Sequence, residues 1–156
     1  MHIIECYIES HWAVQRPDLS FRLNGNDVEV FNVQYAKKED FVEKSVFKFA
    51  VKELTSTNRL EIVLQNKTND LITEQSDHWV DIKNIFLDGI GADWLLYKHT
   101  YFRHSMSKSW VAEMKKNGYD IQKEYRPGTE IKLNGVFGFE FYSPFWLFKT
   151  KQLVIQ

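Results

Sequence analysis

The segment that decides the fold spans residues 77–89 and reads Asp77-His78-Trp79-Val80-Asp81-Ile82-Lys83-Asn84-Ile85-Phe86-Leu87-Asp88-Gly89. It opens with an acidic turn and continues as a largely apolar stretch of strand length. It ends in Asp88-Gly89, a pair that suits the positive backbone angles of a tight hairpin turn. The segment therefore predicts a strand, and the carboxylates at its start make the same place a candidate binding site.

Alternation of apolar and polar residues predicts more half-buried strands along the chain. In residues 46–54, Phe47, Phe49 and Val51 share one face, opposite Lys48. The other segments predicted as strands are residues 3–8, 21–23, 28–33, 60–64, 94–102, 131–133, 137–141, 145–148 and 153–155. We expect residues 28–33 to form a hairpin with residues 21–23 across Asn24-Gly25.

One segment changes to the helical period. Trp110, Val111 and Met114 fall on one helical face, Ser107 can cap the start, and Asn117-Gly118 can end the helix. These short strands and one short helix near residues 107–116 predict an all-β fold, an antiparallel β-sandwich of jelly-roll-like type. Without an internal repeat or a linker, residues 1–156 are expected to form a single domain.

Composition narrows the classes of function. The 156 residues include 20 basic and 21 acidic residues, with no long block of like charge, so no nucleic-acid partner is expected. The sequence has no apolar run long enough for a membrane span and no basic-then-apolar start of an export signal. Cys6 is the single cysteine, which fits a protein made in a reducing cytoplasm and a small buried side chain on a first strand.

No sequence pattern of a common enzyme class is present. The chain lacks a glycine-rich phosphate loop and the GxSxG pattern, and its five histidines never approach HxH or HExxH spacing. Paired carboxylates on a β-sandwich can hydrolyse glycosides, and Glu61 and Glu140 are the first such residues to mutate. Their spacing does not select them, so we expect a protein that is not an enzyme.

The acidic and amide residues around positions 66–88 form the candidate metal site. Calcium takes six to eight oxygen ligands from flexible loops, and Asp77 and Asp81 follow the polar run at residues 66–70. The spacing matches no helix-loop-helix calcium motif. The alternative is that these Asn and Asp side chains shape turns by hydrogen bonding to the backbone.

Aromatic rings offer a second route to binding, because tryptophan faces stack on sugar rings. Trp12 and Trp79 lie at the edges of predicted loops, and Trp110 lies on the predicted helix. These three are the candidate carbohydrate-binding residues. Trp94 and Trp146 lie in continuous apolar runs and are expected in the core.

A resemblance to a known family rests on a series of short motifs. They are Trp12, Pro17, Asn24-Gly25, Val33, Phe47, Phe49, residues 58–62, residues 81–85 and Leu87-Asp88-Gly89. Their order resembles the β-sandwich carbohydrate-binding modules of the xylan-binding type. Small virion proteins of tailed phages carry similar domains, and the closing segment from Asn134-Gly135 to Trp146 is similar to theirs.

The resemblance implies a calcium-dependent sugar-binding loop nearest Asp77 and Asp81. At that place the chain reads Ser76-Asp77-His78-Trp79, with one carboxylate where the modules place two. This mismatch weakens the implied ligand site more than it weakens the implied sandwich architecture.

Two functional hypotheses follow. The first is a non-catalytic structural or adhesive module of a larger assembly, a phage tail or capsid accessory protein, that docks on protein partners or self-associates. It would be located in the virion after synthesis in the host cytoplasm, with a cytoplasmic location as the alternative. The second is a calcium-dependent, lectin-like carbohydrate-binding module. No other cofactor is expected.

Overall fold

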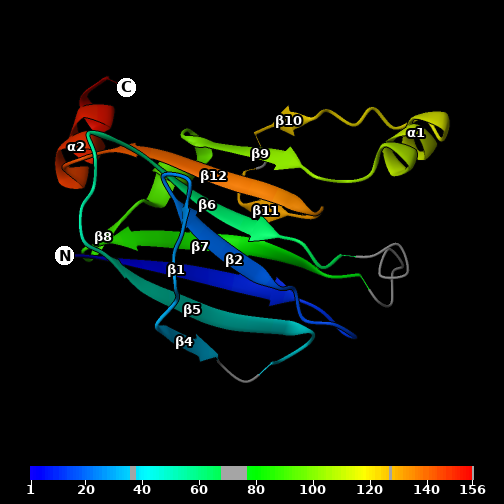
Figure 1. Ribbon diagram of the computed structural model, residues 1–156, viewed down its shortest axis with the longest axis horizontal. Coiled ribbons are helices and arrows are strands. Elements are labelled where there is room, and N and C mark those ends of the chain that lie inside the picture. The colour runs from blue at the N-terminus through cyan, green and yellow to red at the C-terminus, as the bar shows by residue number, and fades with distance from the viewer. Residues whose placement is uncertain (36–37, 68–76, 127, 156) are drawn as a thin grey trace.

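The computed structural model describes residues 1–35, 38–67, 77–126 and 128–155 (Figure 1). The strands form two antiparallel sheets, and the helices lie at the ends of the molecule (Figure 1). The predicted all-β, sandwich-like fold class is confirmed.

The first sheet, sheet A, has the strand order β11-β7-β1-β5-β4, and β8 also pairs with β7. Its strands are β1 (His2–His11), β4 (Asn32–Tyr35), β5 (Val42–Val51), β7 (Trp79–Leu87), β8 (Ile90–Gly91) and β11 (Glu130–Ile131). The opening segment therefore supplies β7, and Asp88 and Gly89, with φ of 50° and 83°, make the turn into β8. The strand and turn predicted for residues 77–89 are confirmed.

The second sheet, sheet B, has the strand order β10-β9-β12-β6-β2-β3. Its strands are β2 (Leu19–Leu23), β3 (Asn26–Asp27), β6 (Thr57–Leu64), β9 (Thr100–His104), β10 (Glu124–Tyr125) and β12 (Gly135–Tyr142). The hairpin predicted for residues 28–33 is wrong in its extent. After the Asn24-Gly25 turn, the short strand β3 pairs with β2, and the chain then crosses to sheet A, where residues 32–35 form β4.

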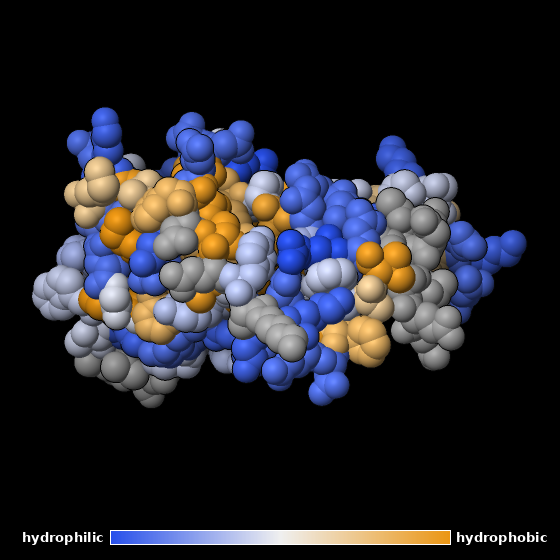
Figure 2. Space-filling view, turned by 90° about the horizontal axis from the view of Figure 1, so that it is seen from below, coloured by the Kyte–Doolittle hydropathy of each residue, from blue (hydrophilic) through white to orange (hydrophobic). Residues whose placement is uncertain are grey.

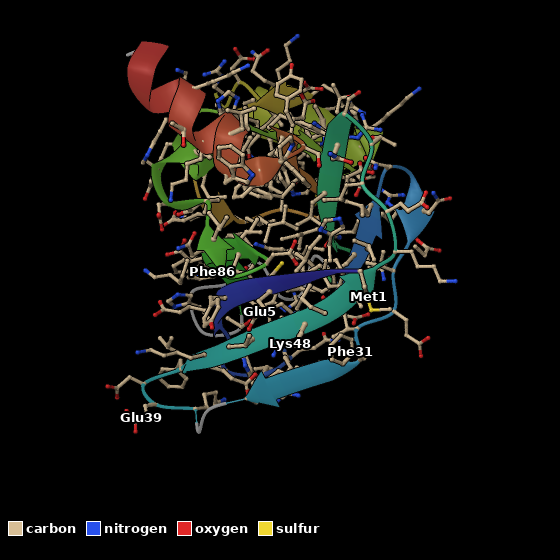
Figure 3. The ribbon with its side chains drawn as sticks, turned by 90° about the vertical axis from the view of Figure 1, so that its left-hand side faces the viewer. Met1, Glu5, Phe31, Glu39, Lys48 and Phe86 are labelled. Carbon is tan, nitrogen blue, oxygen red and sulfur yellow. The ribbon has the colours of Figure 1, made fainter. Side chains whose placement is uncertain are left out.

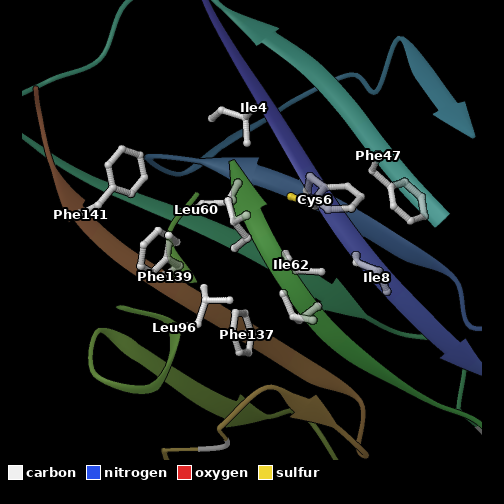
Figure 4. Packing of buried hydrophobic residues seen from close by; sticks show 14 of the residues in the cluster. Ile4, Cys6, Ile8, Phe47, Leu60, Ile62, Leu96, Phe137, Phe139 and Phe141 are labelled. Atoms are coloured by element: carbon white, nitrogen blue, oxygen red, sulfur yellow. The ribbon is translucent and has the colours of Figure 1, made fainter. Parts of the chain in front are cut away.

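The hydrophobic core lies between the two sheets (Figure 4). Inward-facing residues of both sheets belong to one buried cluster, and the ring centroid of Phe21 on β2 lies 5.1 Å from that of Phe47 on β5. Cys6 is fully buried in this cluster, and burial raises the pKa of its thiol. Because successive side chains of a strand point to opposite sides, one set packs in the shared core and the other set lies on the outer face of its sheet.

The predicted helix near residues 107–116 is confirmed as α1 (Lys108–Lys116). The Ser107 hydroxyl accepts a hydrogen bond from the Trp110 N–H at 3.2 Å, which caps the helix start. Gly118 follows the helix with φ of +90°. In Figure 1, α1 lies at the end of the molecule opposite α2.

Apolar runs predicted as strands are helical at two places in the chain. Residues 145–148 and 153–155 lie in α2 (Phe145–Ile155), and residues 94–97 lie in the 3-10 helix η2 (Asp93–Tyr97). Phe145 and Phe148 are both buried, and a spacing of three places them on one helical face. A short, wholly apolar run does not distinguish a strand from a buried helix, which explains both errors.

The helices also change the expected burial of two tryptophans. Trp146 is 57% exposed on α2, so its expected place in the core is wrong. Trp94 on η2 is partly buried and packs against the core. Among the described residues, no helix is long and apolar enough to cross a membrane.

Candidate functional site

The two predicted calcium ligands each lie beside a lysine ammonium. The Nζ of buried Lys67 is 2.6 Å from Oδ1 of Asp77, and the Nζ of Lys83 is 3.4 Å from Oδ2 of Asp81. A cation next to each carboxylate supplies the positive charge that a calcium ion would bring. Within the described parts of the chain, no group of three or more His, Cys, Asp or Glu side chains is placed to hold a metal.

The polar run before β7 is only partly described. Residues 68–70 of that run lie outside the described residues. The Asn66 side chain accepts a hydrogen bond from the Asp18 N–H and donates one to the Arg16 carbonyl, both at 2.9 Å. Asn66 therefore joins two backbone segments, which is the turn-shaping role given above as the alternative.

His78 continues this internal network. The ring is fully buried, and its Nδ1 lies 3.0 Å from the Gln15 carbonyl oxygen. Burial lowers the pKa of His78, although the contact with the Gln15 carbonyl acts in the opposite direction. Asp77 and His78 thus make contacts that hold separate segments of the chain together.

The three candidate tryptophans are already in contact with neighbouring groups. The Nζ of Lys38 lies 3.4 Å from the ring centroid of Trp12, and the His11 ring stacks on Trp79 with a centroid separation of 3.6 Å. Trp110 is 9% exposed and anchors α1. Trp12 follows β1 and Trp79 pairs with His11, so these two lie at one end of sheet A, whereas Trp110 lies on a different element.

The outer face of sheet A combines aromatic residues with ion pairs. Tyr7 on β1 contacts Phe86 on β7 edge-to-face at 5.0 Å, and the Nζ of Lys48 is 3.6 Å from a Glu5 carboxylate oxygen. A shallow groove of about 510 Å³ lies on this face. Figure 3 shows Phe86, Glu5, Lys48 and Phe31 in series across β7, β1, β5 and the start of β4.

One margin of sheet A, which we call the β4 edge (residues 31–35 and Phe41), carries three exposed aromatic side chains. Phe31 is 58% exposed, Tyr35 47% and Phe41 65%. Figure 2 looks onto this side and shows hydrophobic side chains gathered in its left half, the half that contains β4. Among the described strands, β4 pairs only with β5, which leaves its other side open to a partner.

The outer face of sheet B is built differently, from a row of residues that crosses four strands. In register, Tyr101 on β9 is opposite Gly138 on β12, Gly138 is opposite Glu61 on β6, and Glu61 is opposite Arg22 on β2. A Cβ added at Gly138 would lie 2.2 Å from Cζ of Tyr101. The phenol ring therefore lies over the glycine backbone and extends towards Glu61.

Charged side chains of both signs surround this ring. The Glu61 carboxylate lies 3.6 Å from Arg22 and 4.0 Å from Arg59, and its side chain is 11% exposed. Arg59 is also the cross-strand neighbour of Glu140. Burial raises the pKa of the Tyr101 phenol, which keeps the hydroxyl protonated and able to donate a hydrogen bond.

Two adjoining hollows lie on the Glu140 side of the row, with His99 and Glu140 in the lining of both. The first, of about 540 Å³, is also lined by Asn24, Thr57, Asn58, Arg59, Phe141 and Tyr142. The second, of about 450 Å³, is also lined by Lys98, Thr100, Tyr101, Glu124, Tyr125 and Arg126. We call this surface, from Arg22 to Glu124 and including both hollows, the sheet B face.

Sequence patterns had indicated Glu61 and Glu140 but not Tyr101. The available signal was Gly138, a glycine at an outward position inside an alternating strand, where it often marks a close approach by another group. Comparison of the chain with models of known protein families, with curated proteins and with solved structures finds no match. The functional inference therefore rests on the geometry of the two outer faces.

Proposed function

We propose that this protein is a non-catalytic structural module whose copies associate through the β4 edge as part of a larger assembly. The observation that carries the proposal is an open edge strand without a charged residue or proline, flanked by the exposed rings of Phe31 and Phe41. An edge strand presents unpaired N–H and C=O groups, which pair readily with another strand. Exposed aromatic residues beside it add apolar area to such a contact.

The β4 edge differs from the other sheet margins in the length of its edge strand. Among the described strands, β3, β8, β10 and β11 are the other marginal strands, and each has two residues, whereas β4 has four. Short edge strands are a common protection against unwanted pairing. A protein that shortens its other edges and leaves one longer, uncharged edge is suited to a specific strand-to-strand contact.

The larger assembly in this proposal is a phage virion, with the protein as a tail or capsid accessory component made in the host cytoplasm. Support comes from the resemblance to small virion proteins of tailed phages and from an exposed aromatic surface suited to repeated contacts. The calcium-dependent lectin hypothesis has weaker support, because Asp77 and Asp81 each face a lysine.

Cysteine cross-linking tests the proposed contact directly. Cys6 is buried and its thiol pKa is raised, so a new surface cysteine gives a clean signal. We expect Phe31→Cys to form disulfide-linked dimers under mild oxidation, and wild-type protein to show concentration-dependent mass in sedimentation experiments. Tyr119→Cys is the matched control, because Tyr119 is also 58% exposed but follows α1.

Two results would contradict the proposal. One is a strict monomer at every concentration up to about 1 mM, since a weaker contact cannot support an assembly. The other is equal cross-linking of the Phe31→Cys and Tyr119→Cys variants, which indicates random collision in place of a defined edge contact.

A further inference from the structure

The sequence contains three Asn-Gly pairs, a dipeptide whose asparagine can react with its own backbone. They are Asn24-Gly25, Asn117-Gly118 and Asn134-Gly135. The reaction begins when the amide nitrogen of the glycine attacks Cγ of the preceding asparagine, and glycine permits the approach because it has no side chain. The carboxamide must also be free to turn its Cγ towards that nitrogen. The fold therefore decides which of the pairs can react.

In two pairs the asparagine carboxamide is held at both ends. Asn24 Nδ2 donates to Asn58 Oδ1 at 3.0 Å, and Asn24 Oδ1 accepts from the Arg59 N–H at 2.8 Å. Asn134 Nδ2 donates to the Lys67 carbonyl at 2.7 Å, and Asn134 Oδ1 accepts from the Lys67 N–H at 2.8 Å. Each carboxamide must break two hydrogen bonds before it can turn, and this raises the barrier to attack.

In the third pair the carboxamide is free to turn. Asn117 is exposed at the C-terminal end of α1, at one end of the molecule (Figure 1), and no described residue hydrogen bonds to its side chain. A Cβ added at Gly118 would meet no atom from elsewhere in the described chain within 4 Å, so solvent reaches this pair. A Cβ at Gly135 would collide with the Arg103 carbonyl oxygen, so the Asn134 pair is enclosed as well as held.

The attacking nitrogen belongs to the motif that ends the helix. The Gly118 N–H donates to the Lys115 carbonyl at 3.1 Å, and the Tyr119 N–H donates to the Met114 carbonyl at 2.9 Å, which is a Schellman motif. The Gly118 hydrogen bond must open before the nitrogen can attack. Because helix ends fray, a bond in the last exposed turn opens more readily than one inside a sheet.

From these observations we propose that Asn117 is a site of spontaneous deamidation and the preferred one of the three Asn-Gly pairs in the folded protein. Hydroxide removes the proton of the Gly118 amide, and the nitrogen forms a bond to Asn117 Cγ. The bond from Cγ to Nδ2 breaks, and Nδ2 takes a proton from water and leaves as ammonia. Water then opens the resulting succinimide ring. Hydrolysis at Cγ gives aspartate, and hydrolysis at the main-chain carbonyl gives isoaspartate.

The reaction changes the end of α1 in two ways. The new carboxylate lies at the C-terminal end of the helix dipole, where a negative charge is unfavourable, although Lys115 and Lys116 in the last turn offset part of this effect. Isoaspartate also lengthens the backbone by one carbon before Gly118, which moves Gly118 and Tyr119 away from the carbonyl groups they bond. The last turn of α1 should therefore loosen as the protein ages. The β4 edge belongs to another element, so this site does not depend on the assembly proposal.

The test is incubation of the full chain in mildly alkaline buffer, followed by digestion and mass spectrometry of the peptides that contain the three pairs. We expect aspartate and isoaspartate at position 117 to form about tenfold faster or more than at positions 24 and 134, since two ordinary hydrogen bonds oppose the reaction there. In urea the hydrogen bonds are lost, so all three asparagines should react at similar rates.

Two variants separate the effect of the fold from that of the dipeptide. Asn117→Gln should give no product at position 117, because glutamine must close a larger ring. Asn58→Ala removes one partner of the Asn24 carboxamide and should raise the rate at Asn24 while the rate at Asn134 stays unchanged. The thermal midpoint of this variant shows whether it is folded. If it is not folded, the comparison of wild-type protein with and without urea decides.

Hydrogen exchange gives a second measurement. The modified fraction, separated by its extra negative charge on an ion-exchange column, should exchange the amides of Gly118 and Tyr119 faster than the unmodified fraction. The proposal is overturned if Asn24 or Asn134 reacts as fast as Asn117 in the folded protein. It is also overturned if Asn117 reacts only in urea, or if exchange at Gly118 and Tyr119 is the same in both fractions.

Discussion

The outer faces of sheets A and B share one core but differ in the way their side chains meet. On sheet A, the Tyr7 and Phe86 rings contact each other, and the ion pair of Glu5 and Lys48 lies between them and the exposed Phe31 at the β4 edge. On sheet B, Tyr101 lies over Gly138 among charged residues of both signs. The first arrangement leaves aromatic area exposed at a strand edge, and the second holds one ring against the sheet among charged groups.

This comparison shows that strand alternation alone does not determine what a sheet face can do. Both faces have the same polar-apolar period, and both contain exposed tyrosines. A glycine at position 138 lets one tyrosine lie down on the sheet, and this glycine has no counterpart opposite Tyr7, whose cross-strand neighbours are Val46 and Asn84. The identity of the cross-strand neighbour therefore decides whether a tyrosine ring lies against the sheet or contacts another ring.

The largest expected loss of stability comes from a substitution in the hydrophobic core that the two sheets share. Phe139 is 1% exposed, and Phe139→Ala should lower the free energy of unfolding by about 3–5 kcal/mol because it leaves a cavity in the core. Urea denaturation measures this change, with Tyr142→Ala as a control on the same strand that should stay within about 0.5 kcal/mol. Hydrogen exchange should show amides of both sheets losing protection together. Protection lost in sheet B alone would contradict a shared core.

The next effect tests the glycine that distinguishes the sheet B face. Gly138→Ala places a Cβ against the Tyr101 ring and should lower the free energy of unfolding by about 1–3 kcal/mol. In the double variant Gly138→Ala with Tyr101→Ala the collision disappears, so the second substitution should cost less there than in wild type. A double-mutant cycle measured in urea gives this coupling. Purely additive changes would show that the ring does not rest on the glycine.

The pH dependence of the free energy of unfolding tests one buried histidine near each sheet. Burial lowers the pKa of His78 beside sheet A and of His104 in sheet B. Below pH about 6.5 the unfolded chain binds protons that the folded chain does not, so the free energy of unfolding falls as pH falls, by at most about 1.4 kcal/mol per pH unit for each histidine. The free energy of unfolding, measured by denaturation at several pH values between pH 7.5 and pH 5, should therefore depend less steeply on pH in His78→Gln and in His104→Gln than in wild type. An unchanged slope in either variant would show that its histidine titrates alike in both states.

The smallest expected change in stability, and the clearest one in association, concerns the β4 edge. Phe31→Glu should change the free energy of unfolding by less than about 0.5 kcal/mol, because the side chain is mostly exposed. It should nevertheless abolish concentration-dependent association, since the new charge would be buried in the contact. Sedimentation measures this, with Tyr119→Glu as the control that still associates. Association that survives Phe31→Glu would remove the functional contrast between the two sheets.

Periodic segments made the strands of the fold predictable. The apolar-polar alternation of residues 46–54 and of residues 60–64 gave β5 and β6, and Ser107 with Gly118 marked the limits of α1. Wholly apolar runs were harder to interpret. Residues 145–148 became the start of α2, because a run without a polar face carries no period from which to tell a strand from a helix.

The candidate site was less predictable than the fold. Asp77 looked like a metal ligand because its lysine partner, Lys67, is ten residues away in the sequence, whereas Lys83 lies only two residues after Asp81 on the same face of β7. Lys67 reaches Asp77 across residues 68–76, and its ammonium also donates to the Lys132 carbonyl. The nearness of Tyr101 to Glu61 likewise depends on β12 lying between β9 and β6.

The sequence by itself determined which residues of the alternating strands face the core, because alternation fixes that choice locally and the hydrophobic effect enforces it. It also determined the turns, such as Asp88-Gly89, since few residues tolerate positive φ. Only the tertiary structure decided which strands became neighbours. That choice left β4 at an edge and placed Tyr101 over Gly138, because both features depend on pairings between segments far apart in the chain.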